Sequence, residues 1–98
     1  MASSVIPFNV GELKYCGVLN SSNDLNSLTD GIYYIQATAP ANAPENSVVW
    51  CILYQITPTS SMIHQYIFKP ASAVIWMRER SGNPNQWLVW KKLTGTNA

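Results

Sequence analysis

The stretch Val48-Val49-Trp50-Cys51-Ile52-Leu53-Tyr54-Gln55-Ile56 contains the longest apolar run of the chain and decides its fold class. Valine, isoleucine and aromatic residues dominate it, as is typical of a β-strand. Strand alternation leaves both faces apolar: one carries Val49, Cys51 and Leu53, and the other carries Val48, Trp50, Ile52, Tyr54 and Ile56. Such a strand must be covered twice. One cover is the intramolecular core, and the other is a second layer of the chain or a neighbouring subunit. The neighbour is favoured, although the first twenty residues offer another cover.

Similar runs of valine, isoleucine, tyrosine and tryptophan recur between clusters of turn-forming residues. They predict strands over residues 32–38, 48–56, 62–68, 73–80 and 86–93, with an additional edge strand as an option within 5–18. A single helical turn is expected at 22–28, where Asn23 or Asp24 can cap it and Leu25 and Leu28 share one side. The predicted fold is mainly β, a small antiparallel sheet or sandwich of about five to six strands with one short helical turn.

Charged residues make up 11% of the 98 residues, against about 25% in ordinary domains, and the net charge is +1. Serine, asparagine, threonine and glutamine supply the polar residues instead of charged ones. With no basic cluster beyond Lys91-Lys92, the composition argues against nucleic acid as a partner. The longest apolar run is far below the roughly 20 residues of a membrane helix, and the N-terminus lacks a signal-peptide pattern. We therefore expect synthesis in the cytoplasm and no membrane insertion.

The inventory of catalytic and metal-binding groups is small. Cys16 and Cys51 are expected to be free thiols, with Cys51 acting as a small buried hydrophobe. A dyad of Cys51 and His64 has no residue that would orient it. Asp24 and Asp30 sit at turn positions and are interpreted as turn formers. The prediction is a protein without enzymatic activity or cofactor. A metal site would need His64 from each symmetry mate of an oligomer.

Binding suits this composition better than catalysis. In the strand at 73–80, Ala73, Ile75 and Met77 share the core face, and Val74, Trp76, Arg78 and Arg80 share a mixed face. Trp87 follows across the turn, so guanidinium groups are expected against indole rings. Such a patch either binds an anionic sugar or rigidifies the sheet by structural stacking. Structural stacking is the favoured interpretation.

Five segments in a fixed order resemble the pyocin-knob type of domain in tail fibres of bacteriophages and phage-tail-like bacteriocins. They are Asp24-Leu25-Asn26-Ser27-Leu28-Thr29, Gly31-Ile32-Tyr33-Tyr34-Ile35, Ala43-Pro44, Ile75-Trp76-Met77-Arg78-Glu79-Arg80-Ser81-Gly82 and Trp87-Leu88-Val89-Trp90-Lys91-Lys92-Leu93. The resemblance covers residues 24–93. It implies a knob-like β domain there. Outside it, the sequence pattern offers residues 1–23 as an edge strand or arm, and the polar composition of residues 94–98 predicts a flexible tail. The resemblance also implies structural roles for Gly31, Trp87 and Trp90.

The resemblance implies a homotrimeric receptor-binding domain of the virion that attaches the particle to a bacterial surface polysaccharide or lipopolysaccharide. The alternative is a structural knob, plug or decoration protein that trimerises and binds another virion protein, with no host receptor. Seven candidate binding residues follow from the receptor hypothesis: Arg78 and Arg80 as donors to anionic groups, Trp76 and Trp87 as stacking faces, and Tyr34, Gln36 and His64 as positions near loops. The loops at 39–47 and 57–61 are equally plausible contact regions.

Overall fold

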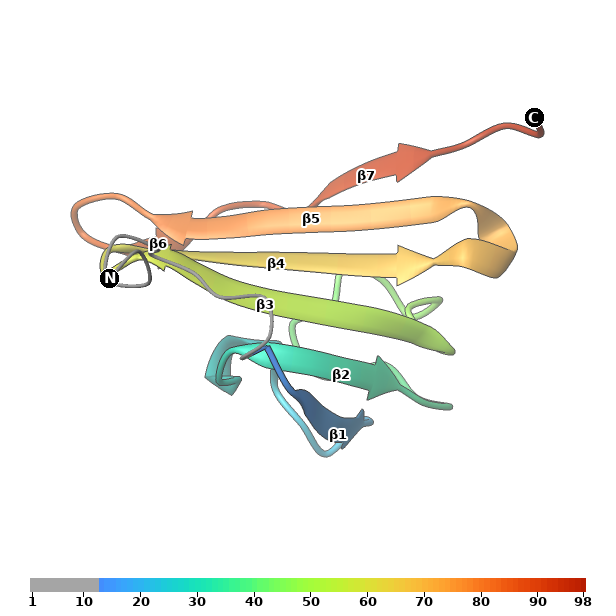
Figure 1. The fold of residues 1–98 in the computed structure, drawn as a ribbon, viewed down its shortest axis with the longest axis horizontal. Coiled ribbons are helices and arrows are strands. Elements are labelled where there is room, and N and C mark those ends of the chain that lie inside the picture. Colours follow the sequence, from blue (N-terminus) through green and yellow to red (C-terminus); the bar gives the residue numbers. More distant parts are fainter. Residues whose placement is uncertain (1–12) are drawn as a thin grey trace, which may run out of the picture.

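The structure, a computed structural model, describes residues 13–98, whose strands form one mixed sheet (Figure 1). The strands are β1 (Tyr15–Leu19), β2 (Gly31–Ile35), β3 (Cys51–Thr59), β4 (Met62–Lys69), β5 (Val74–Ser81), β6 (Gln86–Trp87) and β7 (Lys91–Thr94). β1 to β5 lie side by side in chain order, and β6 and β7 pair with opposite ends of β5. β1 runs parallel to β2, and every other pair is antiparallel. The predicted mainly β class is confirmed.

The strand boundaries depart from the predicted ranges where the backbone leaves the sheet. β3 begins at Cys51 rather than at Val48, because Trp50 adopts a left-handed conformation with φ of 56°. The segment predicted as one strand at 86–93 is two short strands, since Trp90 turns away to donate its indole N–H to the carbonyl of Asn42 at 2.9 Å. β1 falls partly within the optional strand at 5–18, and the part of that range before residue 13 lies outside the described residues.

The predicted helical turn is present as the 3₁₀ helix η3 (Leu25–Ser27). The Asp24 carboxylate caps it by accepting a hydrogen bond from the backbone N–H of Asn26 at 2.9 Å. Leu25 is fully buried and Leu28 packs against the core, so both leucines face inward as expected. A second 3₁₀ turn, η4 (Pro70–Ser72), joins β4 to β5. No helix in residues 13–98 is long and apolar enough to cross a membrane.

Gly31 allows β1 to approach β2 closely. Its φ is 155°, and a Cβ atom at this position would collide with the Lys14 carbonyl and the Cys16 sulfur. The absent side chain lets the N–H of Ile32 donate to the Lys14 carbonyl at 2.8 Å. The resemblance implied a turn role for Gly31. The structure adds a second reason for glycine here, because the start of β2 has no room for a side chain.

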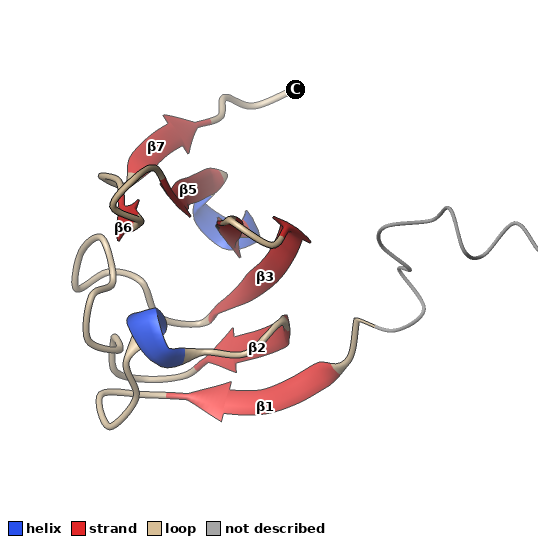
Figure 2. Cartoon of the chain, turned by 90° about the vertical axis from the view of Figure 1, so that its left-hand side faces the viewer, coloured by secondary structure: helices blue, strands red, loops and turns tan. Residues whose placement is uncertain are grey.

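The two faces of the sheet differ in what covers them. η3 and the long connection between β2 and β3 lie over one face, which we call the core face (Figure 2). Its buried apolar residues are Leu19, Leu25, Tyr33, Ile35, Val48, Cys51, Leu53, Ile67, Val74 and Trp76. In β5 this face takes Val74, Trp76 and Arg78, whereas Ile75 and Met77 are on the other side. The expectation that Ile75 and Met77 mark the core face is wrong, because the covering loops lie over the opposite side.

Candidate functional site

A polar ladder crosses the middle of the core face. Gln55, Gln65 and Arg78 stand directly opposite one another on β3, β4 and β5, and all three are buried. Arg78 Nε donates to Gln65 Oε1 at 2.8 Å, and Gln65 Nε2 donates to Gln55 Oε1 at 2.7 Å. Gln65 Nε2 also donates to the Leu25 carbonyl at 2.7 Å, and Gln55 Nε2 donates to the Leu28 carbonyl at 2.9 Å. The ladder therefore fastens η3 to the sheet and satisfies buried polar groups.

The Arg78 guanidinium lies against two indole rings. Its central carbon is 3.8 Å from the Trp87 ring centroid and 4.5 Å from that of Trp90. Burial lowers the pKa of Arg78 to about 10, and the nearby Asp24 carboxylate opposes this shift. Arg78 thus stays a cation at neutral pH. The Lys92–Glu45 ion pair and the His64–Glu79 contact, both within residues 13–98, do not include it. Indole faces and amide oxygens stabilise its charge instead. These contacts are all internal, so they indicate a structural role for Arg78.

Trp76 and Arg78 therefore share the buried face instead of an exposed one. Trp76 is 2% exposed, and its indole N–H donates to Glu45 Oε2 at 3.2 Å. Trp76 presents no free ring face to a ligand, which corrects the expectation that it serves as an exposed stacking position. The predicted stacking of Arg78 on Trp87 is confirmed, in the structural form that the sequence favoured.

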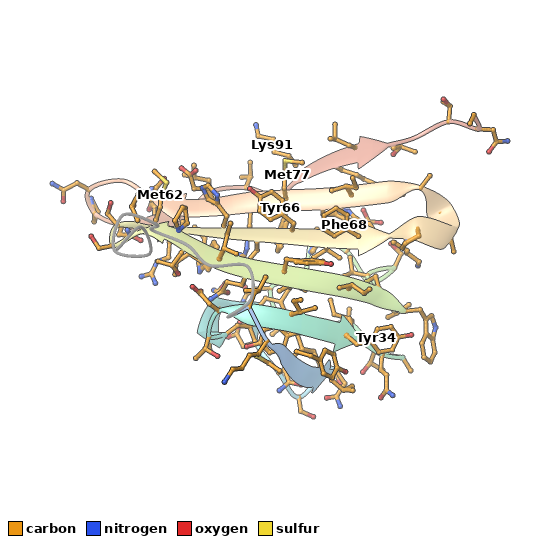
Figure 3. The ribbon with its side chains drawn as sticks, in the orientation of Figure 1. Tyr34, Met62, Tyr66, Phe68, Met77 and Lys91 are labelled. Carbon is orange, nitrogen blue, oxygen red and sulfur yellow. The ribbon has the colours of Figure 1, made fainter. Side chains whose placement is uncertain are left out.

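The opposite face of the sheet is apolar, and we call it the open face. Paired positions build two rows across it: Val18, Tyr34, Ile52, Phe68, Ile75 and Leu93 form one, and Ile32, Tyr54, Tyr66, Met77 and Lys91 form the other. Figure 3 shows Tyr34, Tyr66, Phe68 and Met77 on this side of the ribbon. Tyr54 and Phe68 meet edge to face, with ring centroids 5.3 Å apart. A shallow hollow of about 560 Å³ lies over β3 and β4. Within residues 13–98, no layer of secondary structure covers this face.

His64 belongs to a polar corner of the open face. Its Nε2 lies 2.9 Å from Glu79 Oε1, and its Nδ1 lies 3.3 Å from the Tyr66 hydroxyl. The Ser81 hydroxyl donates to Glu79 Oε2 at 2.6 Å, and this bond and the His64 contact lower the pKa of Glu79. Cys51 faces the core on the other side of the sheet, so it forms no dyad with His64.

Of the two aspartates that were assigned to turns, Asp24 makes a local turn contact, whereas the Asp30 carboxylate accepts hydrogen bonds from side chains of β3. Asp24 caps η3 and also accepts a hydrogen bond from the Asn42 side chain at 2.7 Å. Asp30 accepts from the Thr57 hydroxyl at 2.8 Å. Within residues 13–98 no group of three or more histidine, cysteine, aspartate or glutamate side chains is placed to hold a metal ion.

The other predicted binding residues are dispersed. Tyr34 is half-buried in β2, while Gln36 is exposed just beyond it. Arg80 is half-buried and pairs with Trp87 across β5 and β6. The structure thus brings together Arg78, Arg80 and Trp87. A pocket beside β5 is lined by both Arg78 and His64, but Arg80 and Trp87 are not part of its lining.

Trp50 was not among the predicted site residues. Its side chain is 56% exposed, and its backbone N–H donates to the Gln36 carbonyl at 3.0 Å. The sequence places Trp50 inside an apolar run, where it is indistinguishable from a strand residue. Its left-handed conformation has no local signal, because tryptophan carries no preference for positive φ.

Comparison of the chain with family models, with curated proteins and with solved structures found no match.

Proposed function

We propose that this chain is a non-enzymatic domain of a phage tail fibre that assembles into a homotrimer and attaches the particle to a bacterial surface glycan. The open face is the observation that carries the proposal. Its two rows run across β1 to β5 and β7, and Ile52 at the centre is 37% exposed. An apolar surface of this extent is typical of an interface between chains.

A neighbouring copy suits this face because the face is apolar in its centre and polar at one corner. Phe68, Ile75 and Tyr54 supply the centre, and the His64–Glu79 pair supplies the corner. An apolar core with a polar rim is the usual anatomy of a protein interface. The proposed number of three chains in the assembly is taken from the resemblance to trimeric tail-fibre knobs.

The remaining surface supports recognition of a glycan. Serine, asparagine, threonine and glutamine dominate it, and only 11% of the chain is charged. Hydroxyl and amide groups donate to and accept from sugar hydroxyls, and exposed aromatic rings supply apolar contact. Gln36 and Trp50 are exposed residues of these two kinds, and a hydrogen bond joins their backbones.

A structural knob or plug that binds another virion protein is the second candidate. One observation favours it: Arg78 and Trp76, two groups expected to contact a glycan, are committed to internal contacts. In that case the open face still serves assembly, and the protein needs no host receptor.

Light scattering of the purified chain at micromolar concentration tests the assembly. We expect three times the chain mass for the wild type. Ile52→Lys places a charge at the centre of the open face and should give a folded monomer. Ser27→Lys is the matched control, because Ser27 is exposed on η3 above the other face. A monomeric wild-type protein would contradict the trimer.

An array of bacterial surface glycans, including lipopolysaccharides, separates the two candidate functions. The receptor domain should bind a subset of the array. A protein that forms the trimer and binds nothing on the array would instead be the structural knob.

A further inference from the structure

Trp50 combines an exposed side chain with a strained backbone. Its ring is 56% exposed and its backbone lies in the left-handed region at φ of 56°. Only two other non-glycine residues within 13–98 have positive φ, namely Asn42 and Ala73. Asparagine tolerates this region, and alanine is small; a bulky side chain there is a genuine outlier.

The contacts of Trp50 do not account for a tryptophan at this position. Its one backbone hydrogen bond, to the Gln36 carbonyl, would be made by any residue other than proline. The indole N–H groups of Trp76 and Trp90 donate to Glu45 and to the Asn42 carbonyl, and the ring of Trp87 stacks on Arg78. Trp50 makes neither kind of contact among residues 13–98. A single exposed apolar residue is ordinary, but an exposed one held in a strained backbone points to function.

The loop that leads into Trp50 is held in place by two contacts, and β3 begins directly after Trp50. Val48 is fully buried, and its N–H donates to the Glu45 carbonyl at 3.2 Å. The Lys69 ammonium donates to the Ser47 carbonyl at 2.7 Å. A ring presented on such a loop is positioned before a ligand arrives, which reduces the entropy lost on binding.

We propose that Trp50 is the stacking platform for a pyranose ring, with the exposed Gln36 side chain as the hydrogen-bonding group beside it. This inference rests on the proposed function and names the part of the surface that contacts the glycan. The C–H bonds on the flatter face of a pyranose pack on an indole, and a carboxamide matches vicinal sugar hydroxyls as donor and acceptor. Binding of this kind offsets the cost of the strained backbone at Trp50.

Trp50→Gly separates a binding role from a structural one. Glycine adopts positive φ without steric cost, so removing the ring should leave the melting temperature within about 2 °C of the wild type. Tyr15→Ala is the matched control, because Tyr15 is an aromatic residue that is 62% exposed and has no positive φ.

The probes are methyl β-galactopyranoside and methyl β-glucopyranoside in saturation-transfer NMR, together with the glycan array. We expect transfer from indole protons to the sugar ring in the wild type and in Tyr15→Ala, and its loss in Trp50→Gly. On the array, affinity should fall at least about tenfold in Trp50→Gly, which corresponds to about 1.4 kcal/mol. Gln36→Ala should bind several-fold more weakly than the wild type.

Four results would overturn the inference. They are the absence of saturation transfer from the wild-type protein to the sugar, unchanged binding by Trp50→Gly, a fall of the melting temperature of that variant by more than about 5 °C, and loss of its trimer. Unchanged array binding by Trp50→Gly leaves the proposed receptor function standing with its site elsewhere. A wild-type protein that binds nothing on the array overturns the receptor function itself.

Discussion

Gln65 accepts a hydrogen bond from Arg78 through its side-chain oxygen at 2.8 Å, and both side chains are buried under η3. Gln65 is the centre of the polar ladder, since its amide nitrogen also donates hydrogen bonds to the Gln55 side-chain oxygen and to the Leu25 carbonyl. One residue thus links three strands to the turn that covers them. The strength of this link can be measured by the following substitution.

Gln65→Leu should destabilise the fold by about 3 kcal/mol or more, because it leaves a buried carbonyl, an amide oxygen and a guanidinium N–H without partners. Urea denaturation followed by tryptophan fluorescence measures the free energy of unfolding. Gln86→Leu is the control at an exposed glutamine in β6, and its effect should stay within about 0.5 kcal/mol. Equal effects of the two substitutions would contradict a structural role for the ladder.

The stack of Arg78 on Trp87 should contribute about 1–2 kcal/mol of coupling energy in a double-mutant cycle of Arg78→Lys and Trp87→Ala. Lysine keeps the charge but lacks the planar group that lies against the ring. Each single variant should unfold at lower urea concentration than the wild type. Strictly additive effects would show that the 3.8 Å contact contributes no specific energy.

Acid should destabilise the protein through Glu45. Hydrogen bonds from Ser47, Lys92 and Trp76, in decreasing order of effect, lower the pKa of Glu45 to about 2 from its ordinary value of 4.5. Because the folded state favours the carboxylate, this contribution is present above pH 4.5 and is lost as the pH falls toward 2. Melting temperatures measured from pH 6 to pH 2 should decline less steeply in Glu45→Gln than in the wild type.

Two further variants measure how much the individual hydrogen-bond donors to Glu45 contribute to that acid sensitivity. Ser47→Ala and Lys92→Gln should each flatten the profile, because the Ser47 hydrogen bond is the largest single cause of the lowered pKa and Lys92 contributes both a hydrogen bond and a coulombic effect. A profile in Glu45→Gln identical to that of the wild type would assign the acid sensitivity to the other carboxylates with lowered pKa, Asp24 and Glu79.

The two thiols should differ in reactivity. Burial raises the pKa of the Cys51 thiol to about 11, against a smaller opposing effect of Lys69, whereas the Cys16 side chain is exposed. At pH 8 a thiol reagent should modify one cysteine per native chain and two per unfolded chain, since the thiolate is the reactive form. Cys16→Ser should abolish the native reaction. Rapid modification of both thiols in the native state would contradict burial of Cys51.

Local sequence features predicted the elements whose signals are local. Short apolar runs between turn residues indicated most strands, and Asp24 with Leu25 and Leu28 indicated η3. Local sequence features did not predict which side of the sheet becomes the core. In β5, Ile75 and Met77 are more apolar than Arg78, yet Arg78 is the buried residue, because Gln65, Asn26 and two indole rings meet it there.

The sequence by itself determined that the chain is a mainly β domain with few charges and with a central strand that is apolar on both faces. The alternation of side chains along a strand is a property of the backbone, so it can be read without knowing any neighbour. Only the tertiary structure decided which face the loops cover, because that depends on residues such as Leu25 and Val48 that reach the sheet from distant parts of the chain. It also decided the conformation of Trp50, since positive φ in a tryptophan is imposed by its surroundings and has no signal in the residue itself.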